Sequence, residues 1–556
     1  MWGIKRARAP GYALSLLRSY ALSLLRSCAL SPLRSCALSP LRSYARLAAC
    51  HQSHIGDASQ ILQTLSCTHP NRQIAQIRFL TVFVLLVLLG TLFSAATSQG
   101  SDRPNVLFIY LDDFGWRDAS FMGSDFFETP HLDAMASESM VFTNAYACAA
   151  NCAPARASLM SGQYTPRHQI FNVGTGARGN PKYRRLKHVP GVDTLDPKLK
   201  TWVHCLKANG YKTAMIGKWH LSDDPSPYGF DINIGGSHSG SPPRGYYPPH
   251  NAPGLKDAPA DEYLTDRLTD EAMKFIREQQ TQPWCLYLSH FAVHTPLQAK
   301  RELLAKYQSK PIGDLHQHVV MATMIQAVDD GVGRIESLLN ELKLKENTIV
   351  VFYSDNGGLA AATDMRPLRG SKGMFYEGGI RVPLFVRWPG KIQPIADCSV
   401  PVIGVDLYPT LCELTGSRVL DASQPLDGQS LLPLLLPQQN QRFDEDRALF
   451  WHFPAYLQAS RQEGLESRDP LFRTRPCGII RQGKWKLHEY FEDGGLELYD
   501  LDTDPGETTN LSTQQLETTR RLQQKLIAWR QAIGAPVPLT KNDQFDPVAE
   551  AKALQR

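Results

Sequence analysis

The sequence predicts an α/β fold: a large mixed, mainly parallel sheet sandwiched by helices, followed by a smaller C-terminal α+β subdomain. Between residues 102 and 445, short apolar runs of strand length alternate with longer helical patterns. Most of the short runs are continuously apolar, as in parallel strands that are buried on both faces. From about Ala448 the pattern changes to closely spaced strands followed by a helix. The 556 residues, 43% of them hydrophobic, are enough for both parts.

The first part, residues 102–445, contains the elements of the main sheet in alternating order. Alternation favours parallel pairing, because each crossover returns the chain to the same edge of the sheet. The Pro- and Gly-rich segment Gly235–Gly254 is expected to be a long loop near the mouth of a site. The expected strands are Val106–Tyr110, Thr213–Ile216, Trp284–Ser289, Thr348–Tyr353 and Pro383–Arg387, and the expected helices are Pro130–Ser139, Ala157–Ser161, Asp261–Gln279 and His318–Lys343.

The second part, residues 446–535, is expected to be the α+β subdomain. Its antiparallel strands are predicted at Phe450–Phe453, Gly478–His488 and Leu496–Leu501, and a helix at Gln514–Ile533 is expected to close the chain. The remaining residues, 536–556, form a polar tail that we expect to be loosely held.

Residues 1–98 are expected to be a leader. Residues 13–44 repeat an eight-residue unit, which we interpret as an extended reading frame absent from the mature protein; an arginine-rich transit peptide is the alternative. The basic flank, the apolar run Phe79–Phe93 and the small residues after it are typical of a signal peptide over about 71–98. Because the run is shorter than the roughly 20 residues of a membrane span, we expect export without stable membrane insertion. An uncleaved anchor is the alternative.

Charge and cysteine content exclude two classes of function. The leader carries a balance of +9, so the overall +5 becomes −4 for the remaining chain, which argues against a nucleic-acid partner. Seven of the eleven cysteines follow the leader, and none forms a CxxC pair, which excludes a zinc ribbon. An odd number leaves at least one cysteine outside any internal disulfide. We expect it to be Cys152, and spacing does not decide how the other six pair.

Oxygen-bearing side chains follow two of the expected strands. Val106–Tyr110 runs through Leu111 into Asp112-Asp113, and Thr348–Tyr353 runs through Ser354 into Asp355-Asn356. Ligands in open α/β sheets bind beyond the carboxyl ends of strands, and oxygen ligands suit calcium or magnesium. Alone, the first pair is equally typical of a helix cap and the second of a turn. Together they predict a hard-cation site.

Cationic residues and one cysteine complete the candidate site. Lys218 and His220 follow the strand at Thr213–Ile216, and His294 follows the strand at Trp284–Ser289. Cys152 precedes the expected helix Ala157–Ser161, whose N-terminus favours anionic groups. Taken singly, each of these residues is more typical of a surface cation, a loop histidine or a buried thiol. Their joint occurrence beside the acidic pairs favours a site.

These motifs, in this order, resemble those of the type I sulfatases over nearly all of residues 102–535. Cys152-x-Pro154-x-Arg156 is similar to that family's modification signature. The other matching motifs are Pro104-Asn105-Val106, Gly217-Lys218-Trp219-His220, His294-Thr295-Pro296, Ser354-Asp355-Asn356-Gly357, Arg369-Gly370-Ser371-Lys372, Glu377-Gly378-Gly379 and Arg381-Val382-Pro383.

The resemblance implies an alkaline phosphatase-like fold and a sulfuric ester hydrolase. It implies that a formylglycine-generating or equivalent maturation enzyme oxidises Cys152 to formylglycine. The hydrate of that aldehyde would attack sulfur with one hydroxyl and expel sulfate with the other. One Ca²⁺ per chain would bind to Asp112, Asp113, residue 152, Asp355 and Asn356, while Arg156, Lys218, His220, His294 and Lys372 would surround the sulfate.

Two alternatives remain beside this interpretation. A formylglycine-type phosphonate or phosphate ester hydrolase of the same superfamily shares most of these motifs. A non-catalytic carbohydrate-binding protein would show decay at core positions, and none is decayed. Export favours a sulfated sugar or polysaccharide as substrate. The loop Gly235–Gly254, with Tyr246, Tyr247, His238, Arg244 and His250, is expected to offer sugar-stacking and sugar-reading groups; a solvated loop is the alternative.

Overall fold

The computed structural model describes residues 103–555 apart from the short segments 257–258, 438–441, 460–465 and 469. The described residues fall within one compact unit of the chain. Within them, every helix is too short or too polar to cross a membrane. The expected leader and signal peptide lie outside the described residues.

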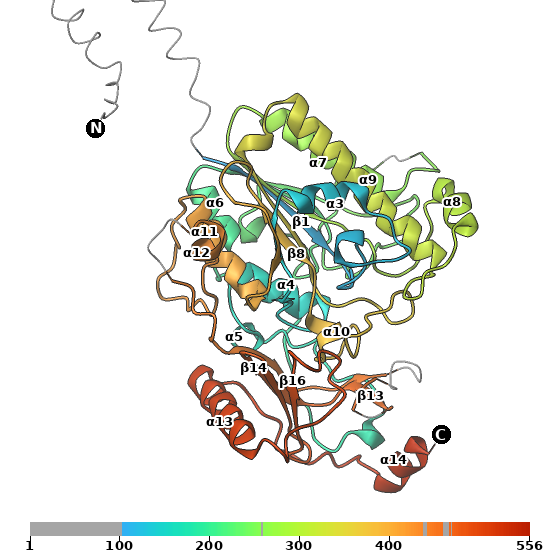
Figure 1. The fold of residues 1–556 in the computed structure, drawn as a ribbon, viewed down its shortest axis with the longest axis vertical. Coiled ribbons are helices and arrows are strands. Elements are labelled where there is room, and N and C mark those ends of the chain that lie inside the picture. The colour runs from blue at the N-terminus through green and yellow to red at the C-terminus, as the bar shows by residue number, and fades with distance from the viewer. Residues whose placement is uncertain (1–102, 257–258, 438–441, 460–465, 469, 556) are drawn as a thin grey trace, which may run out of the picture. The chain divides into compact units, whose positions relative to one another are not determined.

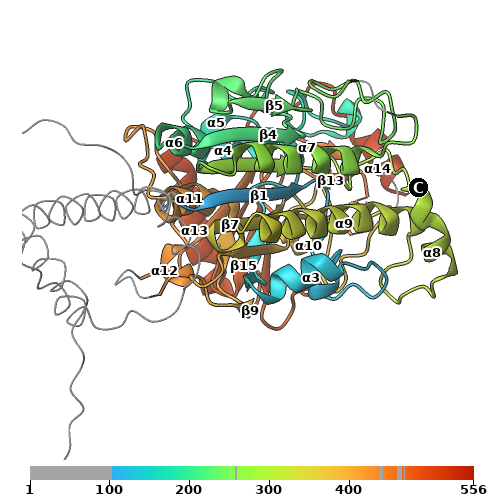
Figure 2. The ribbon, with the colours of Figure 1, turned by 90° about the horizontal axis from the view of Figure 1, so that it is seen from above.

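The main sheet has eight strands, and five of them run parallel side by side, as the sequence predicts (Figures 1 and 2). The antiparallel β8 and the short β2 and β9 extend this sheet at one edge. In spatial order the strands are β5 (Ile232–Ile234), β4 (Lys212–Gly217), β6 (Trp284–Ser289), β1 (Asn105–Leu111), β7 (Thr348–Ser354), β8 (Leu384–Arg387), β2 (Met140–Phe142) and β9 (Ile395–Cys398).

Helices cover both faces of this sheet, which explains its continuously apolar strands. Along β1, Leu107, Ile109 and Leu111 pack in one core, while Val106 and Phe108 pack in the other. One face is covered by α3 (Pro130–Ser137), α7 (Leu264–Gln279) and α9 (Val319–Glu341), and the other by α4 (Cys152–Ser161), α6 (Trp202–Ala208) and α11 (Leu407–Leu414) (Figure 2). The shorter elements are β3 (Ala145–Tyr146), α5 (Thr165–His168), α8 (Leu304–Ser309), α10 (Glu377–Ile380), β10 (Val402–Ile403) and α12 (Leu432–Leu435).

A second, antiparallel sheet forms the C-terminal part and confirms its α+β character (Figure 1). Leu522 and Leu526 of α13 pack on Ile480, Leu487 and Leu498 of this sheet. The chain between the first two strands of this sheet forms a short two-stranded ribbon, which contributes to the site described below. The elements are β11 (Leu449–Phe453), β14 (Cys477–Gln482), β15 (Trp485–Tyr490), β16 (Leu496–Asp500), the ribbon strands β12 (Leu457–Gln458) and β13 (Phe472–Thr474), and α13 (Leu516–Ile533).

Most predicted boundaries differ from the structure by three residues or fewer, and two elements differ more. The helix expected at Ala157–Ser161 begins at Cys152, because Pro154 lies in its first turn, where the missing N–H group has no intrahelical partner to lose. The stretch Gly478–His488 is a hairpin of two strands, since Gly483 takes a left-handed conformation (φ 55°) at the turn between them.

The expectation of a loosely held tail after residue 535 is wrong. The chain continues into α14 (Pro547–Leu554), whose Glu550 is buried. Glu550 accepts hydrogen bonds from Arg475 (3.0 Å) and Arg185 (3.1 Å), and the backbone N–H of Lys187 donates to Thr540 O (2.8 Å). Ion pairs with distant arginines hold this segment, and a tail without an apolar stripe gives no sign of such contacts in its own sequence.

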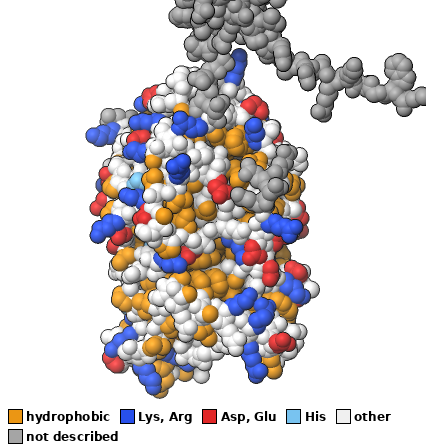
Figure 3. Space-filling view, turned by 90° about the vertical axis from the view of Figure 1, so that its left-hand side faces the viewer, with side chains coloured by type: hydrophobic (Ala, Val, Ile, Leu, Met, Phe, Trp, Pro, Cys, Tyr) orange, Lys and Arg blue, Asp and Glu red, His pale blue; other side chains and the backbone are white. Residues whose placement is uncertain are grey.

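The surface mixes both signs of charge. On the face in Figure 3, basic and acidic side chains are interspersed around patches of apolar atoms. The most exposed large hydrophobic side chains are Ile312 and, in the C-terminal segment, Leu539 and Val548. This face therefore lacks the continuous basic stripe that is typical of nucleic-acid-binding surfaces.

A buried ion network joins the C-terminal sheet to α10. Lys486 of β15 lies 2.9 Å from Glu377 Oε1 and 3.0 Å from Glu507 Oε1, and all three side chains are fully buried. Tyr146 donates to Glu377 Oε2 (2.7 Å), and Arg481 donates to the Tyr146 hydroxyl (2.6 Å). Burial opposes ionisation of Glu377, but Lys486 and Arg481 overcome it and lower its pKa to about 2. Glu377 is therefore ionised only while these cations remain beside it.

We expect Lys486→Met to lower the free energy of unfolding by about 3–5 kcal/mol, because it leaves two buried carboxylates without their shared cation. Lys484→Met is the matched control: its partner Asp500 lies 2.6 Å away, but Lys484 is 42% exposed, so we expect a loss of about 0–1 kcal/mol. Urea denaturation followed by tryptophan fluorescence measures both. Equal losses in the two variants would show that the network adds no more than a surface pair.

Candidate active site

The carboxyl ends of four neighbouring parallel strands meet at one edge of the main sheet. There β1 is followed by Asp112-Asp113, and β7 by Asp355-Asn356. Lys218, after β4, places its Nζ 2.6 Å from Asp112 Oδ2, and Asn356 donates to Asp113 Oδ1 at 2.8 Å. Asp113 in turn donates its backbone N–H to Asp355 Oδ1 (3.2 Å). The side chains that the sequence pairs with separate strands therefore lie in direct contact.

Unusual backbone conformations place several of these side chains. Asp113 (φ 60°) and His220 (φ 68°) are in the left-handed region, which is costly for residues with a side chain and is frequent at functional sites. Gly217 (φ +106°) comes immediately before Lys218, and a Cβ there would lie 1.9 Å from Ser289 O. This close approach lets Lys218 donate its backbone N–H to Ser289 O (2.6 Å).

The buried acidic residues leave oxygen atoms without partners. Asp112 Oδ1 and Asn356 Oδ1 are buried and have no hydrogen-bond partner among the described residues. One ligand atom each from Asp112, Cys152 and Asp355 lie within 4.8 Å of one another, and the same holds for Asp112, Asp113 and His294. Unpartnered buried oxygens are costly, and a hard divalent cation would satisfy them. The donor set fits calcium or magnesium.

The three carboxylates of the site, Asp112, Asp113 and Asp355, differ in pKa. Burial raises the pKa of Asp112 to about 6, although Lys218 opposes this effect, and it raises the pKa of Asp355 to about 6, with the neighbouring Asp112 adding to it. Burial also favours protonation of Asp113, but Lys372 and His294 outweigh it and hold its pKa well below its usual range. The site thus concentrates negative charge that needs cations around it.

Cys152 is the first residue of α4 and is 2% exposed at the base of the site. All seven cysteines of the described part are free thiols. Burial disfavours the Cys152 thiolate, but Lys218 and Lys372 outweigh that effect and lower the thiol pKa. Lys372 Nζ also lies 2.7 Å from Asp113 Oδ1. Burial lowers the Lys372 pKa, but the negative charges of Asp113 and Cys152 outweigh burial and raise it.

Arg156, one turn after Cys152, is held by three structural elements. Its Nε donates to Asp355 Oδ2 (3.0 Å), and its NH1 donates to Lys218 O (3.0 Å) and Ser289 Oγ (2.7 Å). The guanidinium also lies over the ring of Tyr110, 4.8 Å from its centroid. A buried and fully oriented arginine of this kind can support negative charge beside residue 152 without reorganising. The sequence did not identify Ser289 or Tyr110 as its partners.

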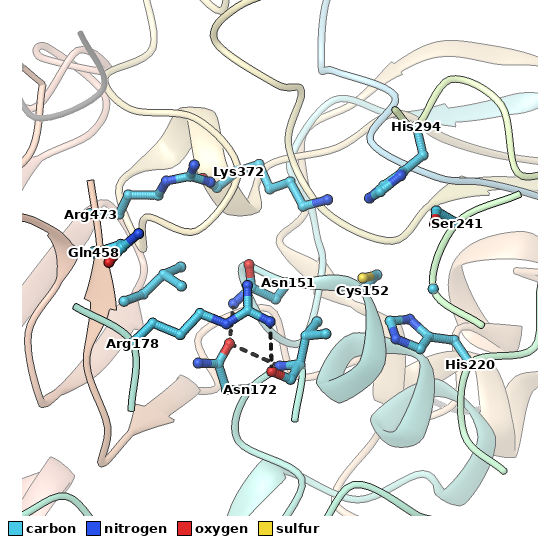
Figure 4. Close-up of a pocket in the computed structure, with 13 residues that line it drawn as sticks. Asn151, Cys152, Asn172, Arg178, His220, Ser241, His294, Lys372, Gln458 and Arg473 are labelled. Atoms are coloured by element: carbon cyan, nitrogen blue, oxygen red, sulfur yellow. Dashed lines mark hydrogen bonds between the residues drawn. The ribbon is translucent and has the colours of Figure 1, made fainter. Parts of the chain in front are cut away.

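Two histidines lie beside Cys152 in Figure 4, and both have a lowered pKa because of burial. For His220, Lys218 and Arg156 add to the effect of burial. The Nδ1 of His220 is buried without a hydrogen-bond partner among the described residues. His294 Nε2 lies 3.7 Å from Asp113 Oδ2. Both imidazoles therefore favour the neutral form, which can accept a proton.

Cys152, His220, His294 and Lys372 line one pocket of about 360 Å³. Figure 4 shows Lys372, His294, His220 and Cys152 around one end of it. The structure brings together every predicted catalytic and metal-binding residue at this place. The pocket also contains residues that no motif signalled, and they come from the residue before α4, the segment after α5 and the C-terminal ribbon. They are Asn151, Asn172, Val173, Arg178, Leu457, Gln458 and Arg473.

The loop Gly235–Gly254 contributes to the pocket differently from the prediction. It lines the pocket with Gly240 and Ser241. Tyr246 is fully buried and donates its hydroxyl hydrogen to Phe291 O and His294 O at 2.8 Å, so its ring supports the His294 loop and is closed to a sugar. The other candidates make protein contacts as well: Tyr247 donates to Ala299 O, His250 pairs with Glu262, His238 contacts Asp193 O, and the exposed Arg244 does not line the pocket.

The family models and the relatives that match this chain all point to one family. The family model described as Sulfatase matches residues 104–417, and the model described as N-sulphoglucosamine sulphohydrolase, C-terminal, matches residues 371–532. A protein named Sulfatase from Formosa agariphila is 30% identical over 85% of this chain and 98% of its own length. The N-acetylgalactosamine-6-sulfatase of Canis lupus familiaris is 32% identical over 66% of this chain and 72% of its own length.

The fold agrees with these sequence matches. The crystal structure of Ps i-CgsB in complex with k-i-k-neocarrahexaose is similar with a TM-score of 0.63 and 28% sequence identity. The likeness covers 82% of this chain and 97% of that one.

Proposed function

This chain belongs to the sulfatase family, and on that premise we propose that it hydrolyses sulfate monoesters on carbohydrate in the pocket at Cys152. The observation that carries the proposal is the convergence of Arg156, Lys218 and Lys372 with buried carboxylates around one residue. A sulfate ester is an anion, and such cations lower the cost of bringing a nucleophile to it. The names of relatives support carbohydrate as the carrier: one is an N-acetylgalactosamine-6-sulfatase, and another was crystallised with an oligosaccharide.

The proposed nucleophile is a formylglycine made from Cys152 by a maturation enzyme of the formylglycine-generating type. Its aldehyde hydrate supplies one hydroxyl for attack on sulfur and a second for release of sulfate. Support comes from the Cys-x-Pro-x-Arg signature and from the position of Cys152 at the base of the pocket, between cations. We include export through the leader at 71–98 in this proposal, because maturation of this kind accompanies export in the family that the sequence resembles.

The proposed metal is one Ca²⁺ held by Asp112, Asp113, Asp355 and Asn356 together with residue 152. The fit rests on the two unpartnered buried oxygens, Asp112 Oδ1 and Asn356 Oδ1, and on the oxygen-rich donor set. A bound divalent cation would supply positive charge beside the attacking oxygen and the sulfate.

The protein's own groups then divide the remaining work. Arg156 and Lys218 are proposed to orient residue 152 and support its charge, because both lie in fixed hydrogen bonds beside it. His220, with a ring nitrogen free of protein partners in the described part, is proposed as the base that takes a proton during sulfate release. His294 and Lys372 border the pocket and are proposed to bind the sulfate and to protonate the leaving alcohol.

The proposal predicts a preference for sulfate over the phosphorus esters of the alternative function. Matched sulfate, phosphate and phosphonate monoesters of one sugar are incubated with the full chain, co-expressed with a formylglycine-generating enzyme. We expect the largest kcat/KM for the sulfate ester, because a monoanionic SO₃ group suits this number of cations. A larger value for the phosphonate would instead support a phosphonate hydrolase, and no turnover of any ester would leave the carbohydrate-binding alternative.

A further inference from the structure

The pocket extends well beyond the space around Cys152. In Figure 4, Arg178, Arg473 and Gln458 lie at the end opposite to Cys152, His220 and Ser241, and the Lys372 side chain extends between the two ends toward His294. A single sulfate group at residue 152 would fill only the part of the pocket beside Cys152. The far end is therefore open to the rest of the substrate, and Arg178 and Arg473 both line it.

Both arginines are placed by the protein scaffold. The backbone N–H of Arg178 donates to Tyr456 O (2.9 Å), and its NH2 donates to Val173 O (2.9 Å). Arg473, in β13, donates from NH1 to Lys372 O (3.3 Å). The neighbouring Thr474 donates from Oγ1 to Gly373 O (2.7 Å), which joins the ribbon to the loop that carries Lys372. Hydrogen bonds to the backbone thus hold the residues of the far end in place and link them to the loop that carries Lys372.

The segment with Arg178 also packs closely on the ribbon. A Cβ at Gly179 (φ +104°) would lie 2.8 Å from the ring of Phe472 and 3.2 Å from Gln458 Cβ. This packing brings a residue from the region after α5 next to residues about three hundred positions later in the chain. It explains why no local motif marks the far end.

The charged residues that line the pocket, among those described, are all basic. None of the described residues that line it is acidic, while Arg178, Lys372 and Arg473 are basic. Lys372 is paired with Asp113 at 2.7 Å, so its charge is partly compensated. Arg178 is exposed, and its NH2 contact is a backbone carbonyl, which leaves the other guanidinium N–H groups available. Two forked guanidinium groups suit a carboxylate or sulfate oxygen cluster better than neutral hydroxyls.

Resting on the function proposed above, the geometry points to a second anion subsite formed by Arg178 and Arg473. This subsite binds a carboxylate or a second sulfate of the same carbohydrate while the scissile sulfate lies at residue 152. The favoured substrate is accordingly an oligosaccharide with at least two negative groups, and the subsite determines this specificity.

Three matched disaccharide sulfates test the subsite. They differ only in the substituent on the neighbouring sugar, which is a hydroxyl, a carboxylate or a second sulfate ester. For the mature full chain we expect kcat/KM to be about 10- to 100-fold higher for an anionic member than for the neutral one, which is the worth of a charge-assisted contact. The advantage should shrink as salt is added. Whichever anionic member is preferred identifies the group that the arginines bind.

The variants Arg178→Ala and Arg473→Ala should each reduce this ratio of kcat/KM toward one. Structural damage would lower kcat/KM for the anionic and the neutral disaccharides alike and would leave their ratio unchanged. Arg184→Ala is the matched control, since Arg184 lies in the same segment and donates to the backbone oxygen of Ala177 but does not line the pocket. It should keep the ratio of the unmodified chain.

The outcomes separate the two proposals. No hydrolysis of any of the three disaccharides would contradict the proposed function itself. Hydrolysis of all three at similar kcat/KM, or a ratio that survives both substitutions, would overturn the anion subsite and leave the sulfatase function in place.

Discussion

Cys152→Ser is expected to lower sulfate ester turnover by on the order of 10⁴-fold or more, the scale seen when a nucleophile is lost. Serine has one hydroxyl, whereas the proposed hydrate has a second that releases sulfate. An attack by serine would leave the sulfate attached to residue 152, so a variant that reacts at all should stop after one turnover. Sulfate release under multiple-turnover conditions, followed by mass spectrometry of the peptide with residue 152, measures both effects.

The control for this variant is Cys398→Ser. Cys398 lies in β9 and does not line the pocket, so its loss removes a thiol without touching the site. We expect activity and thermal stability close to those of the unmodified chain. In the active protein, the peptide with residue 152 should have the lower mass of formylglycine. An unmodified cysteine thiol at that position in a fully active preparation would refute the proposed nucleophile.

The main sheet was predictable because its strands are buried on both faces. The continuous apolar run after Asn105 and the runs before Asp355 and after Pro283 leave no alternative to buried strands of these lengths, and all three are present. Their parallel order made the meeting of Asp113 and Asn356 predictable as well, since it follows from strand direction alone. The parts of the site that depend on strand ends were therefore accessible from the sequence.

The rest of the pocket depends on contacts that sequence patterns do not encode. Arg178 and Arg473 are nearly three hundred residues apart and belong to irregular or short elements, so no periodicity links them. Tyr246 lies in a segment rich in Gly and Pro, which favours an exposed loop, yet its ring stacks on Tyr263 with a centroid distance of 5.5 Å. Tertiary packing decides both cases, so the positions of these residues could not be predicted from local sequence patterns.

Removal of the metal is expected to abolish most of the activity. Treatment with EDTA should lower kcat/KM by at least about 10²–10³-fold, the loss that follows removal of a single charge-stabilising group, and added Ca²⁺ should restore it. The physical reason is the cluster of buried oxygens, in which Asp112 Oδ1 and Asn356 Oδ1 lack partners among the described residues. Mg²⁺ at the same concentration forms a second arm, which tests the preference between the two hard cations.

The ion should also stabilise the fold, and this readout does not depend on activity. Ca²⁺ at about 100 times its Kd should raise the free energy of unfolding by about 3 kcal/mol, because it binds only the folded chain. Asp112→Asn should lose most of that gain. Asp330→Asn is the matched control, since Asp330 belongs to a separate group with His131 and Asp329 that could hold a cation, and it should retain the gain. Loss of the gain in Asp330→Asn alone would move the ion to that second group and remove the metal from the proposed reaction. An unchanged melting temperature with Ca²⁺ in the unsubstituted chain would contradict the metal site altogether, because oxygens that remain unsatisfied without an ion must gain from its binding.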